Sequence, residues 1–192
     1  MPIKDLVILG GPNGAGKTTA AERLLPADLN IREFVNADEI ARGLSPFNPE
    51  GSAVLAGRLM IERIRDLTKS GESFAFETTC AGRSHLRLLR ECRNRGYRLT
   101  LLFLWLPSAE AAVTRVADRV AEGGHSIPTE VIVRRYHAGL RNMHHLYLPA
   151  VNSASIYDNS GEAPVLVAER NPDRHLIIHD SRRWELIEQA SR

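Results

Sequence analysis

The segment that most constrains the fold is a short glycine-rich stretch near the start of the chain. Residues 11–18 read Gly-Pro-Asn-Gly-Ala-Gly-Lys-Thr, after an apolar run at residues 6–9 and before a helical pattern from Thr18 to Leu25. Glycines let the backbone curl so that successive N–H groups converge, and the following helix adds the positive end of its dipole. In this strand–loop–helix context a glycine-rich turn without a ligand is the weaker alternative. The segment is a complete Walker A motif, which binds the phosphates of a nucleoside triphosphate.

The two residues that close this loop carry its chemistry. Lys17 supplies a compact positive charge to the β- and γ-phosphates, and the Thr18 hydroxyl completes the coordination of Mg²⁺. The predicted nucleotide-binding set is unbroken and consists of Gly11, Pro12, Asn13, Gly14, Ala15, Gly16, Lys17, Thr18 and Thr19. The motif carries no information about the group that accepts the phosphate.

The rest of the chain alternates apolar runs with helical patterns, which is typical of a parallel α/β sheet. Predicted strands lie at residues 6–9, 34–35, 73–76 and 98–106, the last being the most apolar and therefore central. Predicted helices lie at residues 18–25, ending at Pro26, at 51–69, at 84–95, from a Ser108 cap to 121, and from a Thr129 cap to 143. Strand-like runs at residues 154–157, 165–168 and 176–178 suggest a hairpin-like extension. We expect a P-loop NTPase of three layers, α/β/α, with a mostly parallel central sheet.

Length and composition favour one globular domain over residues 1–192. The longest apolar run is too short to span a membrane, and the early glycine loop leaves no room for a signal peptide. Cys80 and Cys92 have no metal-ligand spacing, so we read them as structural thiols in a reducing cytoplasm. The net charge of +2 gives little non-specific affinity for nucleic acid, which makes a nucleic-acid partner an unlikely one.

Two predicted strands end in carboxylates, at the edge of the sheet where ligands bind in open α/β folds. Asp38 follows the second strand, and a carboxylate near the γ-phosphate can take the proton of an attacking hydroxyl. The alternative for Asp38 is the N-cap of a helix over residues 39–43.

The third strand end carries the predicted acceptor site. Glu77 could hold acceptor hydroxyls or bind Mg²⁺ through water, and its structural alternative is a hydrogen bond to the phosphate loop or a helix cap. Thr78 and Thr79 could bond the substrate or cap the next helix, and Arg83 is a candidate for a substrate phosphate.

A cluster of arginines flanks a Gly-Gly-His loop and predicts a helical lid over residues 115–143. Its members are Arg115, Arg119, Arg134, Arg135 and Arg141. A mobile arginine can stabilise the transferring phosphoryl group, and Gly123 and Gly124 give the segment hinge freedom. The alternative is a solvated basic face paired with nearby carboxylates. His125 fits a structural role or a lid anchor, while His137, His144 and His145 read as ordinary helix-surface residues.

Together these residues place the chain close to a known family, because it resembles the zeta-toxin-like P-loop kinases. Four segments carry the likeness in family order: GPNGAGKTT at 11–19, VNADEIARGL at 35–44, SFAFETT at 73–79 and RVAEGGHSIPTEVIVRRYHAGLRNM at 119–143. The last is long and specific. The FETT segment differs from that of the toxins beyond its glutamate, and the chain looks closer to a chromosomal subgroup sometimes labelled predicted ABC-type ATPases. We reject that label because the sequence shows no ABC signature.

The resemblance implies a kinase that uses ATP and Mg²⁺. Relatives phosphorylate the 3′-hydroxyl of UDP-N-acetylglucosamine, which makes a sugar nucleotide the implied acceptor, and several are toxins held by a small helical antitoxin. Asp38 matches the family's base, and Glu77 and Thr79 match its acceptor-binding strand end. Glu62 matches a further acceptor contact. Arg119 and either Arg134 or Arg135 match the lid arginines.

Two other functions remain open at this stage. Basic helices at residues 83–95 and 134–141 allow a kinase of nucleoside or polynucleotide 5′-hydroxyls, although they lack aromatic residues for base stacking. A non-catalytic ATP-binding module paired with an antitoxin is the other alternative.

Overall fold

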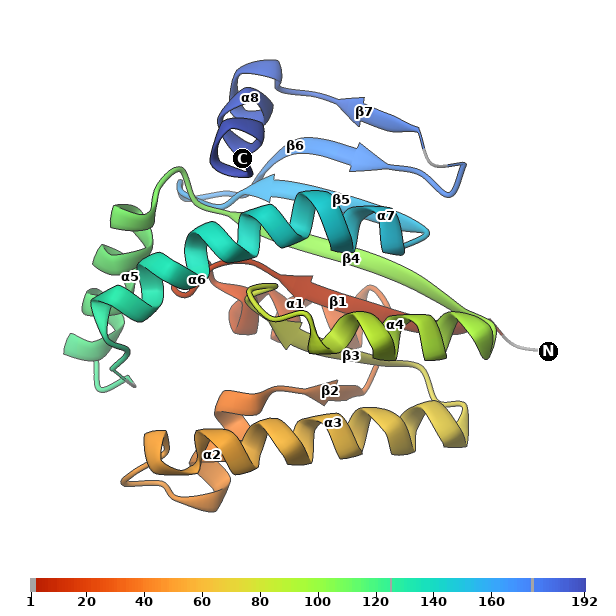
Figure 1. Ribbon diagram of the computed structural model, residues 1–192, viewed down its shortest axis with the longest axis horizontal. Coiled ribbons are helices and arrows are strands. Elements are labelled where there is room, and N and C mark those ends of the chain that lie inside the picture. Colours follow the sequence, from red (N-terminus) through yellow and green to blue (C-terminus); the bar gives the residue numbers. More distant parts are fainter. Residues whose placement is uncertain (1–2, 125, 174) are drawn as a thin grey trace.

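The computed structural model describes residues 3–124, 126–173 and 175–192. Within them the core is a sheet of seven strands in the order β2-β3-β1-β4-β5-β6-β7 (Figure 1). The strands are β1 Lys4–Gly10, β2 Glu33–Val35, β3 Phe74–Thr78, β4 Tyr97–Trp105, β5 Ser153–Asp158, β6 Val165–Arg170 and β7 Leu176–Ile178. Strands β1 to β5 pair in parallel, whereas β6 and β7 add antiparallel. The mostly parallel sheet, the central position of β4 and the antiparallel extension confirm the sequence-based expectations.

Helices cover both faces of this sheet, as predicted for three layers. They are α1 Lys17–Ala27, α2 Ala37–Leu44, η1 Glu50–Ser52, α3 Ala53–Ser70, α4 Ser84–Asn94, α5 Ala109–Ala121, α6 Thr129–Asn142, the π-helical turn η2 Met143–Tyr147, α7 Leu148–Ala150 and α8 Ser181–Ala190. Figure 1 shows α3, α4 and α6 across one face and α1 behind the sheet. No helix of the described residues is both long and apolar enough to cross a bilayer.

Strand alternation explains the two halves of the core. Successive side chains of a strand point to opposite faces, so a strand buried on both sides must be apolar throughout. In β1, Leu6 and Ile8 belong to the large cluster with α3, α4 and α6, while Val7 and Leu9 pack with Ala21 of α1. The central place of β1 fixes the position of the phosphate loop that follows it.

Of three local predictions at helix ends, two fail and one is confirmed. Pro26 lies inside the last turn of α1 instead of ending it, because a proline there removes only one backbone hydrogen bond before the helix stops. Thr129 is the first residue of α6 and does not cap it, since Pro128 occupies the cap position without a side-chain bond. Ser108, by contrast, caps α5 by accepting a hydrogen bond from the backbone N of Ala111 at 3.1 Å, as expected.

The C-terminal helix α8 was not predicted, and it explains why one histidine assignment is wrong. The His144 ring lies 5.7 Å from the Trp184 ring of α8 and 4.9 Å from the His145 ring. His144 is therefore half-buried in a packed contact and is not an ordinary surface residue, whereas His137 and His145 are exposed.

Candidate functional site

The phosphate loop joins β1 to α1 and is held by residues of β4 and of the segment after β5. Gly11 has a φ of 146°, and a Cβ there would lie 2.4 Å from the carbonyl oxygen of Leu104 in β4, so only glycine fits. The Nδ2 of Asn159, just after β5, donates to the carbonyl of Ala15 at 2.8 Å. Strands β4 and β5 thus fix the loop from one side and leave its other side open toward β3.

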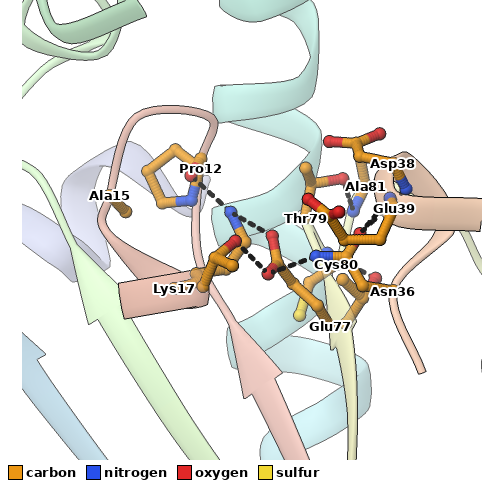
Figure 2. A network of polar contacts seen from close by, with 12 residues as sticks. Pro12, Ala15, Lys17, Asn36, Asp38, Glu39, Glu77, Thr79, Cys80 and Ala81 are labelled. Atoms are coloured by element: carbon orange, nitrogen blue, oxygen red, sulfur yellow. Dashed lines mark hydrogen bonds and ion pairs between the residues drawn. The ribbon is translucent and has the colours of Figure 1, made fainter. Parts of the chain in front are cut away.

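The loop lysine, Lys17, lies against the Glu77 carboxylate at the end of β3 (Figure 2), and the loop threonine contacts the same carboxylate. Lys17 Nζ lies 3.5 Å from Glu77 Oε1 and donates to the Pro12 carbonyl at 2.8 Å. Thr18 Oγ1 donates to Glu77 Oε2 at 2.9 Å. Parallel strands β1 and β3 are neighbours, so their carboxyl ends lie side by side and bring these residues together. Of the two alternatives for Glu77, the structure shows the hydrogen bond to the phosphate loop.

Asn36, which sequence analysis missed, links this cluster to α2. Its Oδ1 accepts from the backbone N of Asp38 at 2.8 Å and of Glu39 at 3.4 Å, so Asn36 is the N-cap of α2. Its Nδ2 donates to Glu77 Oε2 at 2.9 Å. The alternative of Asp38 as the cap is therefore wrong, and the signal was available, because asparagine directly before a helix is a preferred cap.

The Asp38 carboxylate stays without a hydrogen bond or ion pair to the rest of the described chain. It is exposed to a cavity of about 630 Å³ that opens beside the phosphate loop. Several predicted site residues line this cavity together, namely Asn13, Lys17, Asp38, Glu62, Glu77, Thr78, Thr79 and Arg135. Residues from five separate segments therefore converge on one space next to the nucleotide loop.

Other predicted residues lie elsewhere. Arg83 is exposed just before α4, and neither it nor Arg119 nor the exposed Arg134 is among the cavity-lining residues. The Arg115 guanidinium donates to the carbonyl of Ser160, in the segment after β5, at 2.8 Å. Between the two adjacent arginines left open by the sequence, Arg135 is the one that faces the cavity.

Two further lid residues add little to the site. Arg141 donates through Nε to the carbonyl of Arg192 at 3.3 Å, which ties α6 to the end of the chain. The predicted lid anchor His125 lies outside the described residues.

The segment after β3 is clamped onto α6 and η2. Asn142 donates through Nδ2 to the carbonyls of Cys80 and Ala81, at 2.9 Å each, and the Tyr147 hydroxyl donates to Gly82 at 2.9 Å. Burial raises the pKa of the Cys80 thiol to about 12, which fits the structural role expected for it. A Cβ at Gly139 would lie 2.4 Å from the carbonyl of Thr79. This close contact packs α6 against the end of β3 and fixes the backbone position of Arg135.

Three residues that sequence analysis did not single out also line the cavity: Arg58 and Arg65 of α3, and His85 of α4. The His85 ring packs 5.1 Å from the Phe76 ring, and burial lowers the pKa of His85 to about 4, so the imidazole is neutral at pH 7. Its Nδ1 is buried and has no hydrogen-bond partner among the described residues.

The chain is similar to a bacterial protein in sequence and to several solved structures in fold. An uncharacterized protein of Haemophilus influenzae is 29% identical over 126 residues, covering 66% of this chain and 88% of that protein. The crystal structure of AvrRxo1-ORF1:-ORF2 with ATP superposes with a TM-score of 0.74 at 18% identity over 98% of this chain. The match spans 64% of that longer chain.

A second solved structure comes from the PezAT chromosomal toxin–antitoxin system of Streptococcus pneumoniae. It has a TM-score of 0.69 at 15% identity and covers 99% of this chain and 86% of that one. At such identities the likeness establishes the fold, and the fold is that of a P-loop NTPase. The profile of the family described as AAA domain, AAA_33, matches residues 6–142. That match covers more than half of the sequence, and the chain therefore belongs to the AAA_33 family.

Proposed function

We propose that the protein is an ATP-dependent kinase that transfers the γ-phosphate to a hydroxyl of a small-molecule acceptor. The observation that carries this proposal is the position of the Asp38 carboxylate, which has no partner among the described residues and lies on the wall of a cavity that Lys17 of the phosphate loop also lines. A volume of about 630 Å³ lies within the range of small-molecule sites. The cavity therefore favours a compact acceptor over a polynucleotide.

On the nucleotide side, Lys17 and the loop amides bind the β- and γ-phosphates. The donor set beside them suits Mg²⁺, because the Thr18 hydroxyl and the Glu77 carboxylate are hard oxygen ligands in contact at 2.9 Å. Magnesium characteristically takes few protein ligands and fills the rest of its shell with phosphate oxygens and water. When bound, it would neutralise charge on the phosphates. Nucleotide binding would accordingly exchange part of the Lys17 and Thr18 contacts with Glu77 for contacts to phosphate.

On the acceptor side, Asp38 acts as the base. The acceptor oxygen attacks the γ-phosphorus in line, its proton passes to the Asp38 carboxylate, and the bond to the β-phosphate oxygen breaks to release ADP. The Thr78 and Thr79 hydroxyls accept hydrogen bonds from backbone N–H groups just after β3. Thr78 Oγ1 accepts from the backbone N of Cys80 at 3.0 Å, and Thr79 Oγ1 accepts from that of Ala81 at 3.4 Å. Their role is therefore to shape the acceptor wall, and Glu62 supplies a free carboxylate for acceptor hydroxyls.

Arg135 is the arginine we assign to the transferring phosphoryl group, because it lines the cavity from α6. Arg119 of α5 would approach from the other lid helix on closure over residues 115–143. Arg134, which points elsewhere in this structure, has a supporting role at most. We further propose that residues 1–192 act as one domain, since all seven strands join one sheet.

Among acceptors, the resemblance favours UDP-N-acetylglucosamine, phosphorylated at its 3′-hydroxyl. The test incubates the protein with Mg²⁺-ATP and a panel of UDP-sugars, nucleosides and 5′-hydroxyl oligonucleotides. Phosphate on a sugar nucleotide is the expected result. Phosphate on the oligonucleotide would instead select the 5′-hydroxyl kinase and overturn this proposal.

A second candidate is an ATP-binding toxin module paired with an antitoxin. It is favoured by the two solved structures of similar fold, which come from a toxin–antitoxin system and from a two-protein complex with ATP. It predicts tight ATP binding without transfer to any acceptor in the panel. Co-expression with a small helical antitoxin should then give a stable complex that co-purifies with this chain.

A further inference from the structure

Helix α3 carries its arginines on two different faces. Arg63 points away from the cavity and pairs with Glu33 of β2 at 2.7 Å. Arg58 and Arg65 line the cavity, and so does Glu62 between them. These positions are spaced as i, i+4 and i+7, which places all three side chains on one side of a helix.

The cavity-facing charges of α3 do not neutralise one another. Neither guanidinium forms a hydrogen bond or ion pair with another described residue, although Glu62 lies within one turn of both. The outward-facing cations of the same helix behave differently, since Arg63 has Glu33 and Lys69 has Asp66 at 3.5 Å. The helix therefore presents to the cavity two exposed arginines without a partner among the described residues, whereas Arg63 and Lys69, which face away from it, are paired.

We propose that Arg58 and Arg65 are specificity-determining residues that bind a phosphate-type anion on the acceptor, remote from the hydroxyl that is phosphorylated. This inference rests on the proposed kinase function. The planar fork of arginine matches the oxygens of a phosphate or carboxylate bidentately. The two residues lie about 10 Å apart along the helix axis, so their side chains can hold a diphosphate or two separate oxyanions. Lys17 is committed to the nucleotide loop, and Arg83, the phosphate candidate from the sequence, lies outside the cavity.

The charges around the cavity support an anionic acceptor over a neutral one. Three unpaired guanidiniums, those of Arg58, Arg65 and Arg135, line it against two unpaired carboxylates, Asp38 and Glu62. The proposed mechanism uses Asp38 for the hydroxyl and Arg135 for the transferring group. Arg58 and Arg65 of α3 are the unpaired positive charges to which the proposed mechanism gives no role, and a phosphate on the acceptor would neutralise them.

The experiment compares acceptors that share a hydroxyl and differ in phosphate: UDP-N-acetylglucosamine against N-acetylglucosamine, and UMP against uridine. The variants are Arg58→Gln, Arg65→Gln and the double variant, with Arg63→Gln as the matched control on the other face of α3. We expect the KM of the phosphate-bearing acceptor to rise about tenfold for each single variant and about a hundredfold for the double one. The KM for ATP and the values for Arg63→Gln should stay within about twofold of wild type.

Three results would overturn the inference. The first is an equal kcat/KM for phosphate-bearing and neutral acceptors, and the second is an unchanged KM in the double variant. The third is a preference for glucuronate, whose anion is a carboxylate, over the phosphate-bearing acceptors. If no acceptor is phosphorylated, the kinase proposal fails. The proposed anion site on α3 can then still be tested by measuring UDP binding. Equilibrium dialysis of labelled UDP, with the phosphate loop saturated by AMPPNP and Mg²⁺, should show binding that the double variant loses. Absent or unaltered UDP binding would sink the inference.

Discussion

The nucleotide side and the proposed acceptor side of this site are built in opposite ways. The phosphate loop is one continuous segment in which key groups already have partners. Lys17 contacts the Pro12 carbonyl and Glu77, and the Ala15 carbonyl accepts a hydrogen bond from Asn159. The acceptor wall is assembled from separate helices, and it leaves the charges of Asp38, Glu62, Arg58 and Arg65 unpaired. A loop that binds a common nucleotide can be preorganised by its own strand and helix. A wall that selects a particular acceptor must keep its polar groups available for that molecule.

The largest effect is expected from a substitution that disrupts nucleotide binding. Lys17→Ala removes the charge that binds the β- and γ-phosphates, and we expect kcat/KM to fall more than about 10³-fold because no other loop residue can replace it. Titration with a fluorescent ATP analogue should show the loss of nucleotide affinity directly. Lys69→Ala removes an exposed lysine that pairs with Asp66 and should leave both measurements unchanged. Normal turnover in Lys17→Ala would refute the nucleotide assignment.

Asp38→Asn tests the acceptor side alone. The amide keeps the shape of the side chain but cannot take the proton, so we expect kcat to fall about 10²–10³-fold with unchanged ATP affinity. Glu39→Gln, on the exposed face of the same helix turn, is the control. Wild-type turnover in Asp38→Asn would remove that residue as the base, and a parallel loss of ATP affinity would mean that the two sides are not independent.

The same contrast explains what the sequence could and could not predict. Neighbours along the chain make the phosphate loop, so Gly11 to Thr18 could be read directly, together with the strand and helix that flank them. The sequence did not indicate Arg58, Arg65 and His85 as site residues. Helical spacing shows which face of a helix is apolar, but not whether the opposite face meets solvent or a cavity. Helix α8 had readable signals, since Asp180 precedes it as the cap and Trp184 and Ile187 share its buried face.

Arg134 and Arg135 show the limit most clearly. Adjacent residues on a helix point about 100° apart, so only the docking of α6 decides which one faces the site. Gly139 allows that docking, since its missing side chain admits the Thr79 carbonyl. We expect Arg135→Gln to lower kcat about 10- to 100-fold and Arg134→Gln to change it less than about twofold. Steady-state kinetics on the two variants would test this difference. Equal losses of kcat in both variants would contradict the assignment of Arg135 alone to the transferring phosphoryl group.

The smallest expected effect concerns His85, whose burial on the acceptor wall should show in the pH dependence of stability. Its folded pKa is lowered to about 4, from about 6.5 in an unfolded chain, so the unfolded state binds more protons between these values. Stability should therefore be complete above pH 6.5 and fall as the pH drops toward 4. We expect a loss of about 1–2 kcal/mol between pH 6.5 and pH 5 from this one residue, measured by urea unfolding.

His85→Gln should flatten that slope, while His137→Gln, which removes an exposed histidine of α6, should leave it as it is. Part of the slope will remain, because burial also lowers the pKa of His144. An unchanged slope in His85→Gln would mean that water or a shift of the ring satisfies Nδ1 in solution. The acceptor wall would then be less desolvated than the packing of His85 against Phe76 indicates. Its contrast with the phosphate loop, where Lys17 and Ala15 have hydrogen-bond partners, would weaken.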